Sequence, residues 1–134
     1  IRLSLVGSEM CIRDSMVILV GIGAGVGAVC RYLLTVLGRM LWPGKPVATM
    51  MINVLGAFLA GFLAGLPAFS AFRVLLLTGF CGGFTTFSTF MADAFILIRN
   101  RQWRVFVGYY LGIVLLGVLA MAVGLRCSSL IRNF

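Results

Sequence analysis

The chain has 134 residues, of which 62% are hydrophobic and 10% are charged. Soluble domains hold about 45–50% apolar and about 25% charged residues, so this balance excludes an ordinary soluble protein. The formal net charge is +8, but the basic residues are dispersed along the chain. This dispersal favours lipid headgroups over nucleic acid as their partner, and the sequence therefore predicts an integral membrane protein.

Four membrane-spanning helices are expected, since each needs about 20 apolar residues to cross the hydrocarbon core. Their predicted ranges are 17–38, 47–66, 74–98 and 105–125. The connectors "RMLWPGKP", "PAFSAFR" and "RNRQWR" are polar, and the first and third carry tryptophans, which membrane interfaces favour. The apolar runs do not alternate at period two, which disfavours a β-barrel. The predicted fold class is an all-α integral membrane protein.

Residues 1–15, "IRLSLVGSEMCIRDS", hold two of the three acidic residues and no membrane-length apolar run. This stretch resembles a translated sequencing-adapter artefact. We therefore expect a non-native leader at 1–15 and the native subunit at 16–134, starting at Met16. A short cytoplasmic tail is the alternative. A cleaved signal peptide is disfavoured, because the first apolar run continues to Arg31 without a clear cleavage site.

The charges that flank the predicted spans favour neither orientation. With the amino terminus inside and the leader left out, three basic residues fall on the inner side and five on the outer side. Counting Arg2 and Arg13 as well gives five against five. Because positive charge sets orientation, this near balance suggests that the chain inserts both ways and pairs antiparallel.

Cysteine and histidine usage removes several chemistries. No C-x-x-C spacing occurs among Cys11, Cys30, Cys81 and Cys127, so packing is favoured over metal ligation or disulfides. The chain has no histidine, which excludes a His-based metal site, a His proton relay and the usual Ser-His or Cys-His nucleophile. These kinds of chemistry are therefore not expected of this chain.

Glycines in the first span allow two interpretations. Gly23, Gly25 and Ala28 match the G-x-G-x-x-A spacing of a dinucleotide site, but no acidic residue follows about 20 positions later. The pairs Gly21–Gly25 and Gly23–Gly27 instead permit close helix packing in lipid. The second span repeats this pattern with two ridges, Gly56, Ala60, Ala64 and Ala57, Gly61, Gly65.

Polar side chains inside the spans are the functional candidates, because each is costly in lipid unless it meets a partner or water. Arg31 either extends to the interface or draws anions to a vestibule. Thr49 and Asn53 are four residues apart and share a face of the second helix. The Asn53 amide either bonds a neighbouring helix or lines a polar path.

The stretch "GFCGGFTTFSTF" (79–90) is unusual for a membrane span. Gly82 and Gly83 each cost up to about 1 kcal/mol in helix propensity and predict a break there, which lipid tolerates only where protein or water covers the backbone. Freed carbonyls can coordinate a cation, and freed N–H groups favour an anion. Phenylalanines follow at every third position among hydroxyls, and their ring edges can stabilise a small anion. On spacing alone, ordinary packing is favoured, with the hydroxyls bonded to their own helix.

Three segments resemble the Fluc/CrcB family of fluoride channels. They are "GAVCRY" (27–32), "TMMIN" followed by "VLGAF" (49–58), and "GFCGGFTTFSTF". The segments follow one another in the family's order over 16–125, and the third is long and specific.

The resemblance implies an antiparallel, dual-topology homodimer of four-helix subunits, with the third helix broken in mid-membrane and two fluoride pores. It also implies a structural sodium ion at the dimer interface, held by the backbone carbonyls of Gly82 and Thr85 from each subunit. Arg31 is expected in an anion vestibule. The pore residues implied by motif alignment are Phe87, Phe90, Asn53, Ser88, Thr49 and Tyr109.

One departure from the family concerns the fourth helix, where a Tyr is usually followed by a Ser four residues later. Aligning on Gly117 places Tyr109 at the Tyr and Ile113 at the Ser. Either a hydroxyl is missing from the polar path, or Tyr110 is involved instead. Asp93 stands where the family usually carries an acid, commonly Glu.

The implied function is passive export of cytoplasmic fluoride through the cell inner (plasma) membrane, which relieves fluoride toxicity. Two alternatives have a similar size: a small multidrug exporter and a non-transporting membrane assembly subunit. The exporter needs a carboxylate in its first helix, where this sequence has none. The assembly subunit would need neither the glycine pair nor the Phe and hydroxyl pattern.

Overall fold

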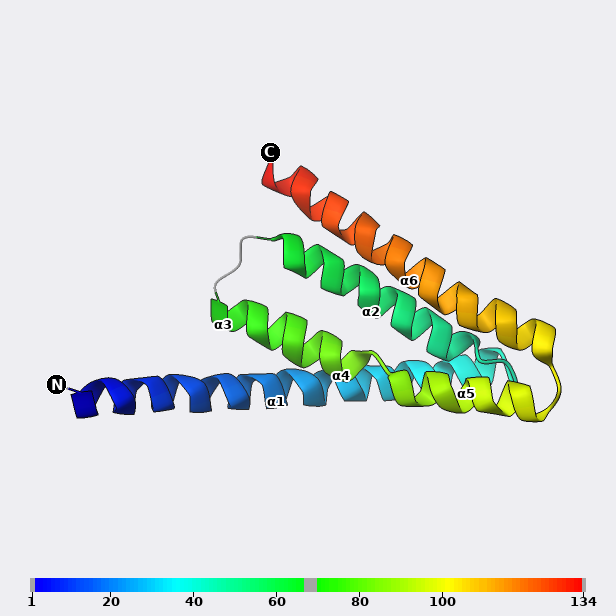
Figure 1. Ribbon diagram of the computed structural model, residues 1–134, viewed down its shortest axis with the longest axis horizontal. Coiled ribbons are helices and arrows are strands. Elements are labelled where there is room, and N and C mark those ends of the chain that lie inside the picture. The colour runs from blue at the N-terminus through cyan, green and yellow to red at the C-terminus, as the bar shows by residue number, and fades with distance from the viewer. Residues whose placement is uncertain (1, 67–69, 134) are drawn as a thin grey trace.

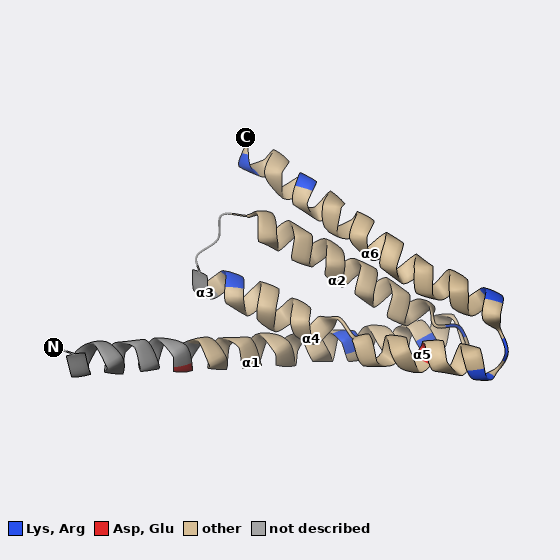
Figure 2. Ribbon diagram, in the orientation of Figure 1, with Lys and Arg blue, Asp and Glu red and all other residues tan. Residues whose placement is uncertain are grey.

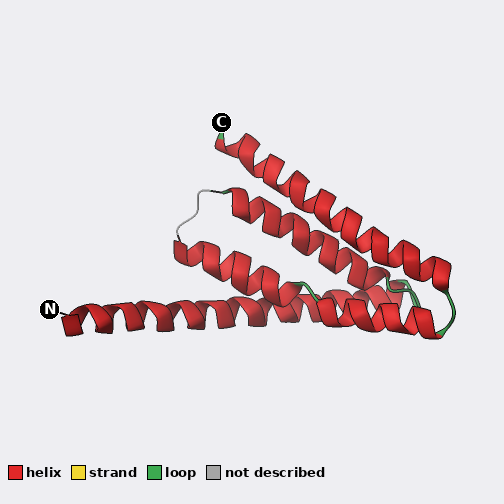
Figure 3. Cartoon of the chain, in the orientation of Figure 1, coloured by secondary structure: helices red, strands yellow, loops and turns green. Residues whose placement is uncertain are grey.

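The computed structural model describes residues 2–66 and 70–133, and within these ranges the chain is helical with short connections and no strand (Figure 3). The side chains of 2–13, 15, 70 and 71 lie outside this description. Three predictions fall partly outside it: the role of Cys11, the charges of Arg2 and Arg13, and the connector at 67–73.

Seven helical segments follow one another in the described chain. They are α1 (Arg2–Leu41), α2 (Val47–Gly65), α3 (Ser70–Arg73), the π-helix η1 (Val74–Cys81), α4 (Gly82–Phe84), α5 (Phe87–Arg99) and α6 (Trp103–Arg132). Four stretches of these helices are long and apolar enough to span a membrane: Met16–Leu41, Val47–Gly65, Val74–Arg99 and Trp103–Arg132. The prediction of an all-α protein with four spans is confirmed.

The two connections α1–α2 and α5–α6 end the preceding helices through local backbone conformation and hydrogen bonds. Between α1 and α2, Gly44 adopts a φ of +75°, a left-handed conformation that glycine reaches without strain. Between α5 and α6, the N–H of Arg101 donates to the Ile98 carbonyl at 2.9 Å and that of Gln102 to the Leu97 carbonyl at 3.0 Å, which closes the end of α5. Among the described residues, most Lys and Arg side chains lie near the ends of helices (Figure 2), as expected for charges that meet lipid headgroups.

Helices α2 and α6 lie side by side (Figure 1) because glycines let their backbones approach. A Cβ on Gly61 would meet the backbone of Met121, and one on Gly124 would meet the backbone of Phe58 and Phe62. Gly65 is in contact with Ser128, which is fully buried. Of the two small-residue ridges predicted on the second span, the one that contains Gly61 and Gly65 therefore contacts α6.

Glycines likewise let α1 pack closely against η1 and α4. A Cβ on Gly23 would meet the backbone of Leu75, and one on Gly27 would meet that of Phe80. Gly21 and Gly25 lie elsewhere on α1, and a Cβ on either would have no neighbour within 4 Å in the described chain. Of the two predicted glycine pairs in the first span, one therefore packs inside the subunit and the other is open.

The third span is interrupted, but not at the glycines. Gly82 has helical dihedral angles, φ −63° and ψ −39°, and belongs to α4 with Gly83. The chain leaves the helix at Thr85 (ψ 159°) and Thr86 (φ −147°, ψ 120°). The prediction that the glycine pair forms the break is therefore wrong, because both glycines are helical. Gly83 instead serves a close approach, in which a Cβ would meet the backbone of Ala24.

Candidate functional site

A cluster of polar side chains joins α2, α5 and α6 around Asp93, the only acidic residue within the four spans. Its Oδ2 atom accepts hydrogen bonds from the Thr49 hydroxyl at 2.7 Å and from the Tyr109 hydroxyl at 3.2 Å. Thr49 and Tyr109 are both buried. The structure thus directs two hydroxyl donors at a single oxygen atom, which is a negatively charged one when Asp93 is ionised.

Aromatic rings line one side of this cluster. Phe90 is 5% exposed, and its ring centroid lies 5.6 Å from that of Tyr109 and 5.4 Å from that of Tyr110. Phe87 and Phe90 meet in an edge-to-face arrangement, with centroids 5.9 Å apart and an interplanar angle of 61°. In this arrangement the edge of one ring, which carries partial positive charge, faces the other ring.

A pocket of about 590 Å³ leads from the helix connections toward the Asp93 cluster. Its lining includes Lys45 from the first connector, Gln102 from the last one, and Tyr109. Lys45 supplies a positive charge to this lining. The pocket lining therefore contains both a basic side chain and Tyr109, the residue whose hydroxyl bonds Asp93.

Asn53 lies one turn further along α2 and bonds the interruption between α4 and α5. Its Nδ2 donates to the Thr86 carbonyl at 3.0 Å, and its Oδ1 accepts from the Thr86 N–H at 2.9 Å. In a continuous helix, the Thr86 N–H would donate to the Gly82 carbonyl instead. The contact with Asn53 therefore frees the Gly82 carbonyl from that partner.

Thr86 also caps α5. Its hydroxyl oxygen accepts from the Thr89 N–H at 3.3 Å and from the Thr89 hydroxyl at 2.9 Å. In a continuous helix the Thr89 N–H would donate to the Thr85 carbonyl. That carbonyl instead accepts from the guanidinium of Arg31 at 3.3 Å. Both carbonyls implied in cation binding have thus lost their helical partners, and one of them faces a positive charge.

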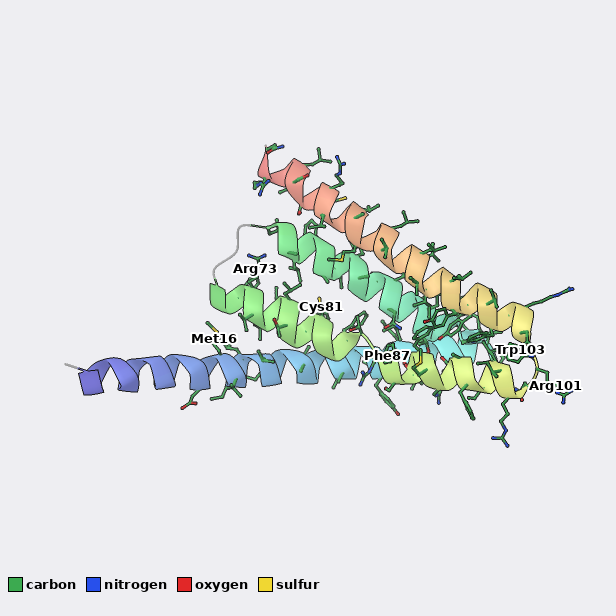
Figure 4. The ribbon with its side chains drawn as sticks, in the orientation of Figure 1. Met16, Arg73, Cys81, Phe87, Arg101 and Trp103 are labelled. Carbon is green, nitrogen blue, oxygen red and sulfur yellow. The ribbon has the colours of Figure 1, made fainter. Side chains whose placement is uncertain are left out.

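The residues predicted for the site fall into two groups within the subunit. Thr49, Phe90 and Tyr109 gather at Asp93, and the others surround the interruption: Arg31, Asn53, Gly82, Thr85, Phe87 and Ser88. Ser88 is exposed, with its Oγ 3.3 Å from that of Thr86. Phe87 is 72% exposed beside the interruption (Figure 4). Ile113 is buried together with Tyr109 and Phe90.

Sequence reasoning did not place two residues that the structure makes central. The first is Thr86, which one sequence signal could have identified, since a Thr directly before an apolar helix is a common N-cap. The second is Asp93, which the sequence marks as an acid within a span but assigns no partner. Pairing it with Thr49, 44 positions away, needs the packing of α2 against α5.

These features define a multi-pass membrane protein whose third span is interrupted beside a set of hydrogen-bonding side chains. The family described as CrcB-like protein, Camphor Resistance (CrcB), matches residues 18–125. The chain belongs to this family, which confirms the resemblance found in its motifs.

Several relatives match most of the chain. A protein of Chlorobium phaeobacteroides (strain BS1) is 37% identical over 123 residues, which cover 88% of this chain and 96% of that protein. One of Hydrogenobaculum sp. (strain Y04AAS1) is 42% identical over 108 residues, covering 77% and 88%. Both are named "Fluoride-specific ion channel FluC". A third, from Ligilactobacillus salivarius (strain UCC118), is 43% identical over 105 residues, covering 78% and 92%, and is named "Fluoride-specific ion channel FluC 1".

Proposed function

We propose that this protein is a subunit of a fluoride-selective channel that releases cytoplasmic fluoride passively through the cell inner membrane and so relieves fluoride toxicity. The observation that carries this proposal is the membership of this chain in the CrcB-like family over residues 18–125. Its relatives named as fluoride-specific ion channels match it along most of their length. Transport of this kind needs no covalent step, so the protein is not an enzyme in this proposal.

The proposed assembly is an antiparallel homodimer with dual topology, in which the interruption of the third span lies in mid-membrane. Gly82 supports it, because its helical dihedral angles do not require glycine and the space for a Cβ is empty in the described subunit. A glycine with no constraint inside the subunit is expected where a second chain approaches closely. Gly21 and Gly25 are open in the same way.

In this assembly the carbonyls of Gly82 and Thr85 from both subunits would hold a sodium ion. The Gly82 carbonyl fits such an ion, since the Thr86 N–H that it would accept in a helix bonds Asn53 instead. The Thr85 carbonyl is free of the Thr89 N–H but accepts from the Arg31 guanidinium, which would have to withdraw for this carbonyl to bind the ion. Carbonyl oxygens are suitable ligands for a hard cation. When bound, the ion would offset the repulsion between carbonyl dipoles brought together at the dimer axis.

The proposed fluoride path uses the side chains of both groups. Lys45 in the pocket lining and Arg31 near the interruption attract the anion. The hydroxyls of Thr49 and Tyr109 donate hydrogen bonds to one oxygen of Asp93. A small anion can accept these two hydrogen bonds instead of the carboxylate oxygen. The ring edges of Phe87 and Phe90, with the donors of Asn53 and Ser88, then replace part of the water shell of the ion.

Reconstituted protein tests this function directly. Liposomes loaded with potassium fluoride are expected to release fluoride rapidly when the purified protein and a potassium ionophore are present, and liposomes loaded with potassium chloride are expected to retain their anion. A fluoride electrode and a chloride electrode measure the two effluxes. Equal release of both anions, or no release from a folded protein, would contradict the proposal, and proton-coupled drug uptake would support an exporter instead.

Orientation in the host membrane tests the dual topology. A reporter fused to the carboxyl terminus is expected to be found on both sides of the membrane, because three basic residues stand against five when the leader is left out. In the control, Arg132→Gln leaves two against five and is expected to favour the orientation that keeps connector 99–104 in the cytoplasm. A single orientation for the unaltered chain would contradict dual topology.

A further inference from the structure

The amide of Asn53 makes an unusual contact for a side chain in a membrane span. It bonds both backbone polar groups of one residue, accepting from the Thr86 N–H at 2.9 Å and donating to the Thr86 carbonyl at 3.0 Å. Thr86 is buried, and its backbone is extended. An amide opposite an extended residue supplies the pair of bonds that a neighbouring β-strand would supply.

Such a contact is needed because the interruption removes helical partners in a setting where lipid supplies none. An unpaired backbone group in hydrocarbon costs several kcal/mol. The chain cannot restore these bonds by forming a continuous helix, because the segments on either side are fixed by their packing. Gly83 holds α4 against the backbone of Ala24 in α1, and Phe90 holds α5 against Tyr109 in α6.

We propose that Asn53 is a positioning residue that holds the interruption between α4 and α5 in its extended form, by substituting for the helical partner of the Thr86 N–H and adding a bond to the Thr86 carbonyl. The same face of α2 supports this role one turn later, where a Cβ on Gly56 would meet the Thr85 side chain. Through Asn53 and Gly56, α2 thus contacts both interrupted residues. Only the consequence for fluoride rests on the proposed function, since the contact itself belongs to the fold.

The position of Thr86 determines the hydrogen bonding of the residues on both sides of it. Its hydroxyl caps α5 through Thr89, and its N–H, once bonded to Asn53, no longer bonds the Gly82 carbonyl. Loss of the Asn53 amide would therefore loosen the start of α5, the segment that carries Phe87 and Phe90. The second N–H of the Nδ2 group is fixed in direction by the first, which orients it for a further acceptor.

Amide hydrogen exchange at Thr86, measured by mass spectrometry on the purified full chain in detergent, tests the proposal. Asn53→Leu removes donor and acceptor at similar volume, and exchange at Thr86 is expected to rise about tenfold or more, since a buried N–H loses its partner. Asn53→Thr, a smaller change for the case in which the Leu variant fails to fold, is expected to give the same rise. Met51→Leu, at an exposed position of α2, is the matched control and is expected to leave the rate unchanged.

Asn53→Asp separates the two roles that the sequence left open for this residue. Asp retains an acceptor for the Thr86 N–H, so exchange at Thr86 is expected to stay within about threefold of the unaltered chain, while the added negative charge lowers fluoride flux. Unchanged or slower exchange at Thr86 in Asn53→Leu and Asn53→Thr would overturn the proposal and leave Asn53 as a path residue only. Absence of fluoride flux in the unaltered protein would overturn the channel function but not this contact.

Discussion

Replacing Phe90 by isoleucine is expected to reduce fluoride flux from liposomes by up to about tenfold, since a ring-edge contribution of up to about 1.5 kcal/mol corresponds to a factor of that size. Phe90 is packed against Phe87, Tyr109 and Tyr110. Isoleucine keeps much of the apolar burial but has no quadrupole, so the fold should persist while an anion loses a stabilising edge. Flux is measured with a fluoride electrode, and helix content by circular dichroism.

Phe87 provides the companion experiment, because it is exposed within the subunit whereas Phe90 is buried. Phe87→Ile should leave the packing of the subunit intact, so a fall in flux can be assigned to the ion path or to contact with a second chain. Normal flux in both folded variants would return these rings to ordinary packing, the interpretation that spacing alone favoured.

The sequence predicted the four spans closely, because a segment that lies in lipid must consist mainly of apolar residues. The second span was predicted at 47–66 and lies at Val47–Gly65, and the third was predicted at 74–98 and lies at Val74–Arg99. The fourth was predicted too short, since helix α6 continues to Arg132. A hydropathy pattern ends where polar residues begin, whereas backbone hydrogen bonding continues through Arg126 and Ser128.

The details of the site were less predictable because they depend on which helix faces which. The sequence placed Thr49 and Asn53 on one face of α2. It could not show that Thr49 bonds Asp93 while Asn53, one turn later, bonds Thr86. The π-helix η1 also has no marker in its apolar sequence. The sequence assigned the break to the flexible glycines. The residues that leave the helix are instead Thr85 and Thr86, whose backbone polar groups bond the side chains of Arg31 and Asn53.

Gly82 and Gly83 are neighbours with opposite surroundings, which makes them a matched pair for testing the assembly. A Cβ on Gly83 would meet the backbone of Ala24, whereas a Cβ on Gly82 would meet no described atom within 4 Å apart from its own stretch of helix. Gly83→Val is therefore expected to separate α4 from α1 and destabilise the subunit by about 3 kcal/mol or more, since backbone cannot move aside as a side chain can. Thermal unfolding in detergent measures this loss.

Gly82→Val is expected to leave the subunit as stable as before, because valine accepts helical dihedral angles slightly better than glycine does. In the proposed dimer the added side chain would crowd the axis, so cross-linking should show loss of the dimer and liposomes should show loss of fluoride flux. Cys81→Ala, which removes a buried sulfur from the adjacent position, is expected to cost about 1 kcal/mol and to retain both dimer and flux. Replacing sodium by a much larger cation should lower the melting temperature of the unaltered dimer but not that of the Gly82→Val subunit. If Gly82→Val formed a normal dimer with normal flux, Gly82 would face lipid, and neither a close chain contact nor a carbonyl cage could lie at this position.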